Sequence, residues 1–314
     1  MAVTDLHSLD VSTAIDKLFS TGGTIPGAVL SLVQDTPQIN VGDNTPLVIN
    51  GRAKGSLRHE GQAKVDNGRT ITPRPFTTAK MVYSQRVTKE FLAWDEQRQG
   101  DYVSRLINDW ISKSMGRDID TVVIHGVDPN SGAVDTQLSD YIRKTGSSIL
   151  VPSTGTSSTQ VDADLATAIA ALEGQNITGV AISTDAAKAL ANVTIGNYRK
   201  YPEIGVFGLS GNMLGGRQAA STPEVGAIDG TEFVVGDWSQ LLLGFAGNAV
   251  WETLTSGNPD GVFDENGKAI DLGNVNMACI RLELMFGFRV LDSDAFAVVS
   301  EVEEPEEPEE PDES

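Results

Sequence analysis

One stretch near the C-terminus limits the choice of fold more than any other part of the chain. In residues 273–300, GNVNMACIRLELMFGFRVLDSDAFAVVS, apolar side chains occupy every second position from 280 to 290. The charged side chains fall between them: Arg281, Glu283 and Arg289. This period of two predicts a long antiparallel strand with one buried and one solvated face. The turn-forming residues 292–294 and the apolar run 295–299 then predict a short returning strand.

Length and cysteine content limit the number of domains and the kind of cellular compartment. The 314 residues suffice for one large or two medium domains. The single cysteine, Cys279, rules out an internal disulfide and fits a reducing compartment. The N-terminus lacks the basic and apolar regions of a signal peptide, and no apolar run is long enough to span a bilayer. We therefore expect a soluble intracellular protein with no membrane contact.

The chain is strongly acidic, with a formal net charge of −20. Nine of the acidic residues lie after Ser300, in a proline-spaced segment without Lys or Arg, so the rest of the chain carries −11. Residues 301–314 have almost nothing apolar to bury, which predicts a disordered acidic tail. Tight binding to a phosphate backbone needs clusters of Lys and Arg, so the acidic body argues against a nucleic-acid-binding protein.

The first part of the chain has little core of its own. Residues 1–45 are predicted to form an arm with at most one short amphipathic helix. From 45 to 88 the chain is predicted to be extended, with Asn67-Gly68 as the two-residue turn of a long hairpin. The flanks of this turn are polar. Because a hairpin without an apolar face is marginal alone, we expect this one to rest on a neighbour.

The longest helix is predicted over residues 91–126, where apolar side chains recur at three- and four-residue steps until Gly126. Residues 127–158 are predicted to be a loop with a short helical or extended piece at 138–142. The pattern then becomes α/β. The elements expected there are a helix capped by Asp162 or Asp164, a strand at 179–182, a helix at 186–191, a glycine-rich loop at 196–226, strands at 232–235 and 239–253, and a polar turn at 256–267.

The order of these parts resembles the major capsid protein family of tailed bacteriophages, the Hong Kong 97 fold. The most specific segments are HEGQAK at 59–64, FTTAKMVYSQRVTKEFL at 76–92, GDWSQLLLGF at 236–245, and the final strand followed by DAF at 294–296. The likeness extends over roughly 56–126, 162–192 and 231–299, and rests on order and spacing together.

The resemblance implies an α+β capsid fold divided into named parts. These are an N-terminal arm at 1–45, an extended loop at 46–88, a peripheral domain with a spine helix at 89–150, an axial domain at 151–235, a return to the peripheral domain with closing strands at 236–300, and the disordered tail at 301–314.

The function implied is that of a major capsid protein, which self-assembles through pentamers and hexamers into an icosahedral shell. Such a shell encloses double-stranded DNA without sequence-specific binding and is located in the virion, after assembly in the host cytoplasm. Its further partners would be separate scaffolding, portal, protease or decoration proteins. The acidic tail would be either an exposed appendage or a charge brake on premature assembly.

Some members of this family lock the shell through a self-made isopeptide bond, and three residues match that pattern. Lys64 lies where the family's crosslinking lysine is expected, and Asn276 and Glu283 lie where its asparagine and its glutamate base fall. Residues seven apart on a strand point to opposite faces, so Asn276 and Glu283 of one chain are not expected to serve the same bond. A site composed from several subunits fits better.

Each of these residues also has an ordinary interpretation. Lys64 is otherwise a solvated lysine, Asn276 a turn residue, and Glu283 part of the wet face of a strand. Many shells of this fold are held together without covalent bonds, so both interpretations stay open at this point.

The sequence shows no metal-binding or catalytic motif that would indicate another class of function. Asp260, Asp264 and Asn266 resemble a calcium loop but miss its ligand spacing, and one cysteine with three scattered histidines gives no zinc set. We therefore expect no metal, no cofactor and no enzyme activity beyond self-crosslinking. Two alternatives are a nanocompartment (encapsulin-like) shell protein of the same fold and, from another class, a soluble α/β enzyme with an acidic tail.

Overall fold

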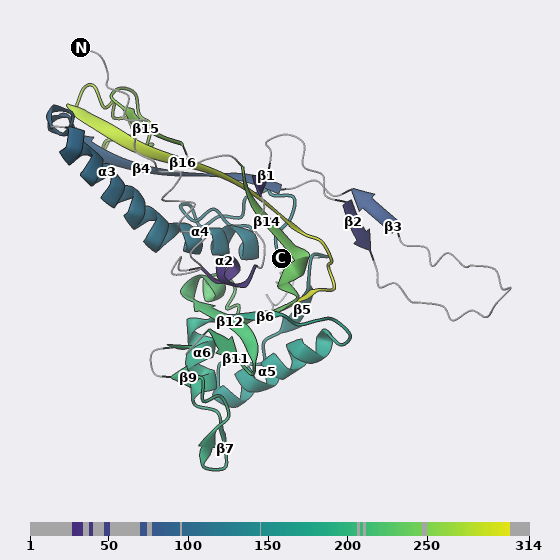
Figure 1. Cartoon of the computed structure of the whole chain (residues 1–314). Helices are drawn as coiled ribbons and strands as arrows, with labels where there is room; N and C mark the ends of the chain where they lie inside the picture. Colours follow the sequence, from purple (N-terminus) through teal and green to yellow (C-terminus); the bar gives the residue numbers. More distant parts are fainter. Residues whose placement is uncertain are drawn as a thin grey trace, which may run out of the picture.

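The chain is an α+β protein built on two sheets and one long helix, as its computed structural model shows (Figure 1). No helix within the described ranges has the length and apolar character needed to cross a bilayer. The structure describes residues 27–33, 38–39, 47–50, 70–73, 77–94, 96–144, 146–205, 208–209, 212–246 and 250–301.

The predicted C-terminal strand is the centre of a five-stranded sheet. This strand, β16 (Met277–Val290), pairs antiparallel along most of its length with β4 (Thr77–Thr88). Its other edge is shared by β15 (Val250–Leu254) and β14 (Leu241–Ala246), and β1 (Gln38–Ile39) lies parallel to β14. The strands predicted at 239–253 therefore exist, but each pairs with β16 and not with the other.

The alternation along β16 is confirmed. Its buried side chains, each no more than 2 % exposed, are Ile280, Leu282, Leu284, Phe286, Phe288 and Val290. They face the main hydrophobic core, together with Leu241 and Leu243 of β14. The side chains between them, Arg281, Glu283 and Met285, lie on the opposite face.

The extended segment 45–88 divides into two structures. Strands β2 (Leu47–Asn50) and β3 (Thr70–Pro73) form a two-stranded antiparallel sheet that Figure 1 shows projecting from the body. The Asn67-Gly68 turn lies outside the described residues. Strand β4, predicted as part of the same hairpin, instead belongs to the five-stranded sheet, because its apolar residues Met81 and Val87 join the core.

The predicted long helix begins slightly later than expected and ends at Gly126, as expected. Gly126 terminates it in the left-handed conformation (φ 69°) that favours glycine. Buried side chains on one side, such as Val103, Ile107 and Ile119, hold it against the sheet. A separate 3₁₀ turn, η2 (Lys89–Ala93), precedes the helix, and the extended Trp94 follows that turn. The parts of the helix are α3 (Glu96–Trp110), a π-helical turn η3 (Ile111–Met115), α4 (Gly116–Asp120) and a π-helical turn η4 (Thr121–His125).

The second sheet has six strands and is covered on both faces. One face packs on helices α5 (Ser158–Ala171) and α6 (Thr184–Ala191), and the other on the main core, which includes the short helix α2 (Ala28–Leu32). The strand order is β11 (Met213–Leu214), β12 (Arg217–Thr222), β6 (Gly179–Ser183), β13 (Phe233–Gly236), β17 (Phe296–Ser300) and β5 (Ile149–Pro152).

Short strands and 3₁₀ turns accompany this sheet. Strands β7 and β8 form a hairpin, and so do β9 and β10. Two 3₁₀ turns lie next to the sheet strands. The bounds are β7 (Thr194–Ile195), β8 (Tyr198–Arg199), β9 (Ile204–Gly205), β10 (Gly208–Leu209), η5 (Pro223–Gly226) and η6 (Trp238–Gln240).

Four expectations for residues 138–300 were wrong. The glycine-rich run 196–226 is not a loop, because it contains β12, which pairs parallel to β6. The returning strand β17 does not lie beside β16; it pairs with β13 and β5 in the other sheet. Helix α5 is capped by Ser157 and Gln160 in a capping box, and not by Asp162 or Asp164. Residues 138–142 form neither a helix nor a strand.

Candidate functional site

The solvated side of the five-stranded sheet is the candidate site, and we call it the exposed sheet face. The register pairs Glu283 of β16 with Val82 of β4 and with Val250 of β15, and paired residues lie on the same side of a sheet. The exposed sheet face is formed by Lys80, Val82, Val250, Glu252, Arg281, Glu283 and Met285.

Glu283 is held by charges of its own chain. The Lys80 ammonium lies 2.5 Å from its carboxylate, and the Arg281 guanidinium lies 3.8 Å away. Arg281 also reaches Glu252 at 3.5 Å, so positive and negative groups alternate across three strands. The Lys80 side chain is 46 % exposed, so the Lys80–Glu283 pair adds at most about 1 kcal/mol to stability. No local pattern in the sequence indicated that Lys80 is the partner of Glu283.

Three apolar side chains on the same face remain open to solvent. Val82 is 48 %, Val250 57 % and Met285 36 % exposed. Val82 and Val250 lie on either side of Glu283 in the strand register. The ion pair of Glu283 is thus surrounded by an apolar surface that the described residues of this chain leave uncovered.

Asn276 lies at the end of the loop that leads into β16. It is exposed and has a positive φ of 54°, a conformation that asparagine tolerates better than most residues. Its backbone carbonyl accepts a hydrogen bond of 3.1 Å from the Lys89 amide, which fixes this corner to the 3₁₀ turn η2. Because β16 begins at Met277, the argument from alternating strand faces does not apply to Asn276.

The length of strand between Asn276 and Glu283 keeps these two residues of one chain apart. The strand from Met277, the residue after Asn276, to Glu283 makes six steps of roughly 3.3 Å, or about 20 Å. The structure therefore does not bring these two residues of one chain together. Lys64, the third residue predicted for the crosslink, lies outside the described residues.

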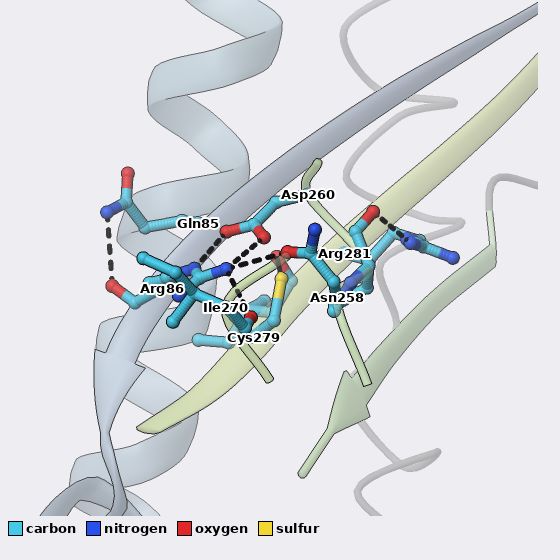
Figure 2. Close-up of polar contacts among 9 residues, drawn as sticks. Gln85, Arg86, Asn258, Asp260, Ile270, Cys279 and Arg281 are labelled. Atoms are coloured by element: carbon cyan, nitrogen blue, oxygen red, sulfur yellow. Dashed lines mark hydrogen bonds and ion pairs between the residues drawn. The ribbon is translucent and has the colours of Figure 1, made fainter. Parts of the chain in front are cut away.

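The loop before Asn276, residues 255–276, is fixed to the sheet by Arg86 (Figure 2). The Arg86 guanidinium donates to the Asp260 carboxylate at 2.5 and 2.7 Å, to the Asn258 side chain at 2.9 Å and to the Ile270 carbonyl at 3.1 Å. Asp260 raises the pKa of Arg86, and Arg86 in turn holds the pKa of the Asp260 carboxyl below its usual value. Both side chains are largely shielded from water.

These contacts also account for the residues that resemble a calcium loop. Asp260 binds Arg86, and the Asp264 side chain accepts the backbone amides of Asn266 and Lys268. Within the described residues no group of acidic, His or Cys side chains is arranged to hold a metal ion. The resemblance to a calcium loop arises from turn chemistry.

Comparison with known proteins decides the family. The sequence model of the Phage capsid family matches residues 26–300. The chain belongs to the phage capsid family. This capsid protein is structural, and its function is that of a major capsid protein that assembles into the shell of a virion.

Solved structures share the fold of this capsid protein. A chain from Gordonia phage Cozz is 24 % identical, with a TM-score of 0.67, and the match covers 90 % of this chain and 88 % of that one. A chain from Mycobacterium phage Ogopogo is 23 % identical, with a TM-score of 0.66 and coverage of 89 % and 93 %. The capsid of a native GTA particle is 12 % identical, with a TM-score of 0.56 and coverage of 89 % and 93 %. A search of curated protein sequences found no match.

Proposed function

We propose that this capsid protein builds its shell by placing the extended loop of one copy on the exposed sheet face of a neighbouring copy. The observation that carries the proposal is the apolar surface of Val82, Val250 and Met285, which the described residues leave open. Strands β2 and β3 supply the other side of the contact, because among the described strands they pair only with each other. Each copy then covers a surface that its neighbour exposes.

The two halves of the molecule suit different places in the shell. In this proposal the helix from α3 to η4 is the spine of a peripheral domain that includes the five-stranded sheet. The six-stranded sheet with α5 and α6 is the axial domain, which lies at the centre of each pentamer and hexamer. Support comes from the hydrophobic clusters, because α5 and α6 have a cluster separate from that of the long helix.

The same contact offers a site for an isopeptide crosslink between subunits. The Lys64 amine, once deprotonated, attacks Cγ of Asn276 in another copy and forms a new amide bond. The Cγ–Nδ2 bond breaks, and the nitrogen leaves as ammonia. Glu283 acts as the base: it takes the proton from the lysine and returns it to the departing nitrogen. Atoms and charge balance without an external reagent.

The separation of Asn276 and Glu283 supports a site composed from several copies. If one copy presents Asn276, then the glutamate must come from a different copy, because the strand from Met277 to Glu283 alone is about 20 Å long. Lys80 is the ordinary partner of Glu283 in the free chain. An arriving Lys64 would displace Lys80 from the carboxylate, so the base becomes available only where subunits meet.

A denaturing gel of purified particles, followed by mass spectrometry of digested bands, tests the crosslink. We expect a ladder of covalent multimers and a Lys64–Asn276 peptide that is lighter by one ammonia. Lys64→Gln and Glu283→Gln should abolish the ladder, and Lys54→Gln, a nearby lysine change, should keep it. Particles that dissolve into single chains would remove the crosslink and leave the shell function intact.

The proposal also includes the place of assembly, the partner proteins and a role for the acidic tail. Assembly would take place in the host cytoplasm around double-stranded DNA, with scaffolding, portal, protease or decoration proteins as separate chains. The acidic tail would act as a charge brake on assembly. Deletion of residues 301–314 tests this role, since unchanged yield and fidelity of particles would contradict it.

A further inference from the structure

A polar cavity of about 320 Å³ lies where the loop after the long helix meets the end of β16. It does not overlap the exposed sheet face or the crosslink residues. Two cationic side chains, Lys144 and Arg289, line it together with the Asp140 carboxylate. Serine side chains, including Ser147 and Ser293, complete most of the wall. In a chain with a formal net charge of −20, a cavity lined by more positive than negative groups is unusual.

The carboxylate of this cavity is already occupied by structural contacts. Asp140 accepts a 2.6 Å hydrogen bond from the Ser147 hydroxyl and a 3.0 Å hydrogen bond from the Val290 amide. Its side chain is 5 % exposed, and the Arg289 Nε lies 3.3 Å from it. Asp140 therefore shapes the cavity and offsets one positive charge.

The donors of the cavity are only partly used. Lys144 donates one of its three N–H groups to the Ser139 carbonyl, at 2.6 Å. The Arg289 side chain is 18 % exposed, and its buried Nε faces the Asp140 carboxylate. Within the part of the chain that the structure describes, no hydrogen bond of the Arg289 guanidinium is present. The Arg289 guanidinium and the Lys144 ammonium thus keep N–H groups that an anionic acceptor in the cavity could use.

We propose that this cavity binds a phosphate group, with Arg289 and Lys144 as its cationic ligands and the Ser293 hydroxyl as a further donor. A planar guanidinium can donate two parallel hydrogen bonds to two phosphate oxygens, and a lysine ammonium adds a compact charge. Free phosphate and the phosphodiester of packaged DNA share this chemistry. The cavity would give an otherwise acidic shell protein one defined phosphate contact.

Thermal unfolding of the full-length chain tests the binding, with inorganic phosphate compared against chloride at equal ionic strength. A ligand that binds only the folded state raises Tm with a saturable dose dependence, by about 2 °C or more once its concentration well exceeds Kd. Lys144→Gln should abolish this rise. Lys188→Gln changes an exposed lysine on α6 and should preserve it. Equal responses of the two variants would overturn the proposal.

A second measurement does not depend on a variant that folds. Phosphorus NMR should show broadening of the inorganic phosphate signal by the wild-type chain, reversed by excess sulfate. A short DNA duplex that competes with phosphate would identify the phosphodiester as the bound form, whereas failure to compete would assign the site to free phosphate. Stabilisation by a Glu-rich peptide of the tail sequence, with none by phosphate, would overturn the proposal in favour of a carboxylate.

Discussion

Asp120, near the end of the long helix, accepts a 2.6 Å hydrogen bond from the backbone amide of Ala28, 92 residues earlier in the chain. The same carboxylate accepts the Val29 amide at 2.8 Å and the Thr222 hydroxyl at 3.1 Å. Asp120 is fully buried. One side chain thus ties together helix α2, the long helix and the end of β12. A five-residue helix such as α2 is unstable alone, so these contacts determine its place.

Replacement of Asp120 should therefore destabilise the chain. Asp120→Ala leaves two buried amides without acceptors, and we expect a loss of about 2–4 kcal/mol in the free energy of unfolding. Asp120→Asn keeps one acceptor oxygen and should lose less. Urea unfolding measures both, with the exposed Asp101→Ala on α3 as control. If Asp120→Ala and the control were equally stable, the carboxylate would have no such role.

Glu232 predicts a dependence of stability on pH. Burial, with the nearby charges of Asp164 and Glu301, raises the pKa of Glu232 from 4.5 to about 7, despite a hydrogen bond from Ser153. The folded chain holds this proton more tightly than the unfolded chain. The contribution of Glu232 to stability therefore falls as pH rises from 4.5 to about 7.

Glu232→Gln should remove this dependence, because glutamine keeps an acceptor for Ser153 but has no charge. Above pH 7 we expect the variant to be more stable than the wild type by on the order of 2 kcal/mol, and near pH 4.5 the difference should disappear. Unfolding at several pH values measures it, with the exposed Glu173→Gln as control. A difference that stays constant with pH would contradict the assignment.

Arg86 should hold the loop that ends at Asn276. Arg86→Gln removes the paired bonds to Asp260 and leaves that carboxylate without its cation, so we expect a loss of about 2–3 kcal/mol. Proteolysis should cut within 255–276 faster in the variant. The exposed Arg105→Gln on α3 serves as control. Unchanged cleavage would show that other contacts fix the loop.

The two faces of the five-stranded sheet should respond differently to mutation. Phe288 is fully buried, and Phe288→Ala should lower stability by about 3–5 kcal/mol. Val82 lies on the exposed sheet face, and Val82→Ser should change stability by no more than about 0.5 kcal/mol. We expect Val82→Ser to reduce the yield of particles on a sizing column. Normal assembly of this variant would argue against the exposed sheet face as a subunit contact.

Local sequence signals were sufficient for several elements. The alternation from Ile280 to Val290 predicted β16 and its buried face, because a period of two is visible in any strand with one solvated side. Gly126 marked the end of the long helix, since a glycine at this position acts through local backbone chemistry. The resemblance to capsid proteins supplied the family.

Contacts between distant residues were not visible in the sequence. The pattern of β17 showed a buried strand but not that β13 and β5 are its partners, and the glycine-rich run concealed β12. Nor did any local signal connect Asp120 to Ala28, Glu283 to Lys80, or Arg86 to Asp260. A residue's own neighbours determine which of its sides is buried, whereas strand pairing and ion pairs depend on chain segments that meet only after folding. The sequence by itself therefore determined several of the elements and the family, and the tertiary structure alone decided the partners of each strand and of each charged side chain.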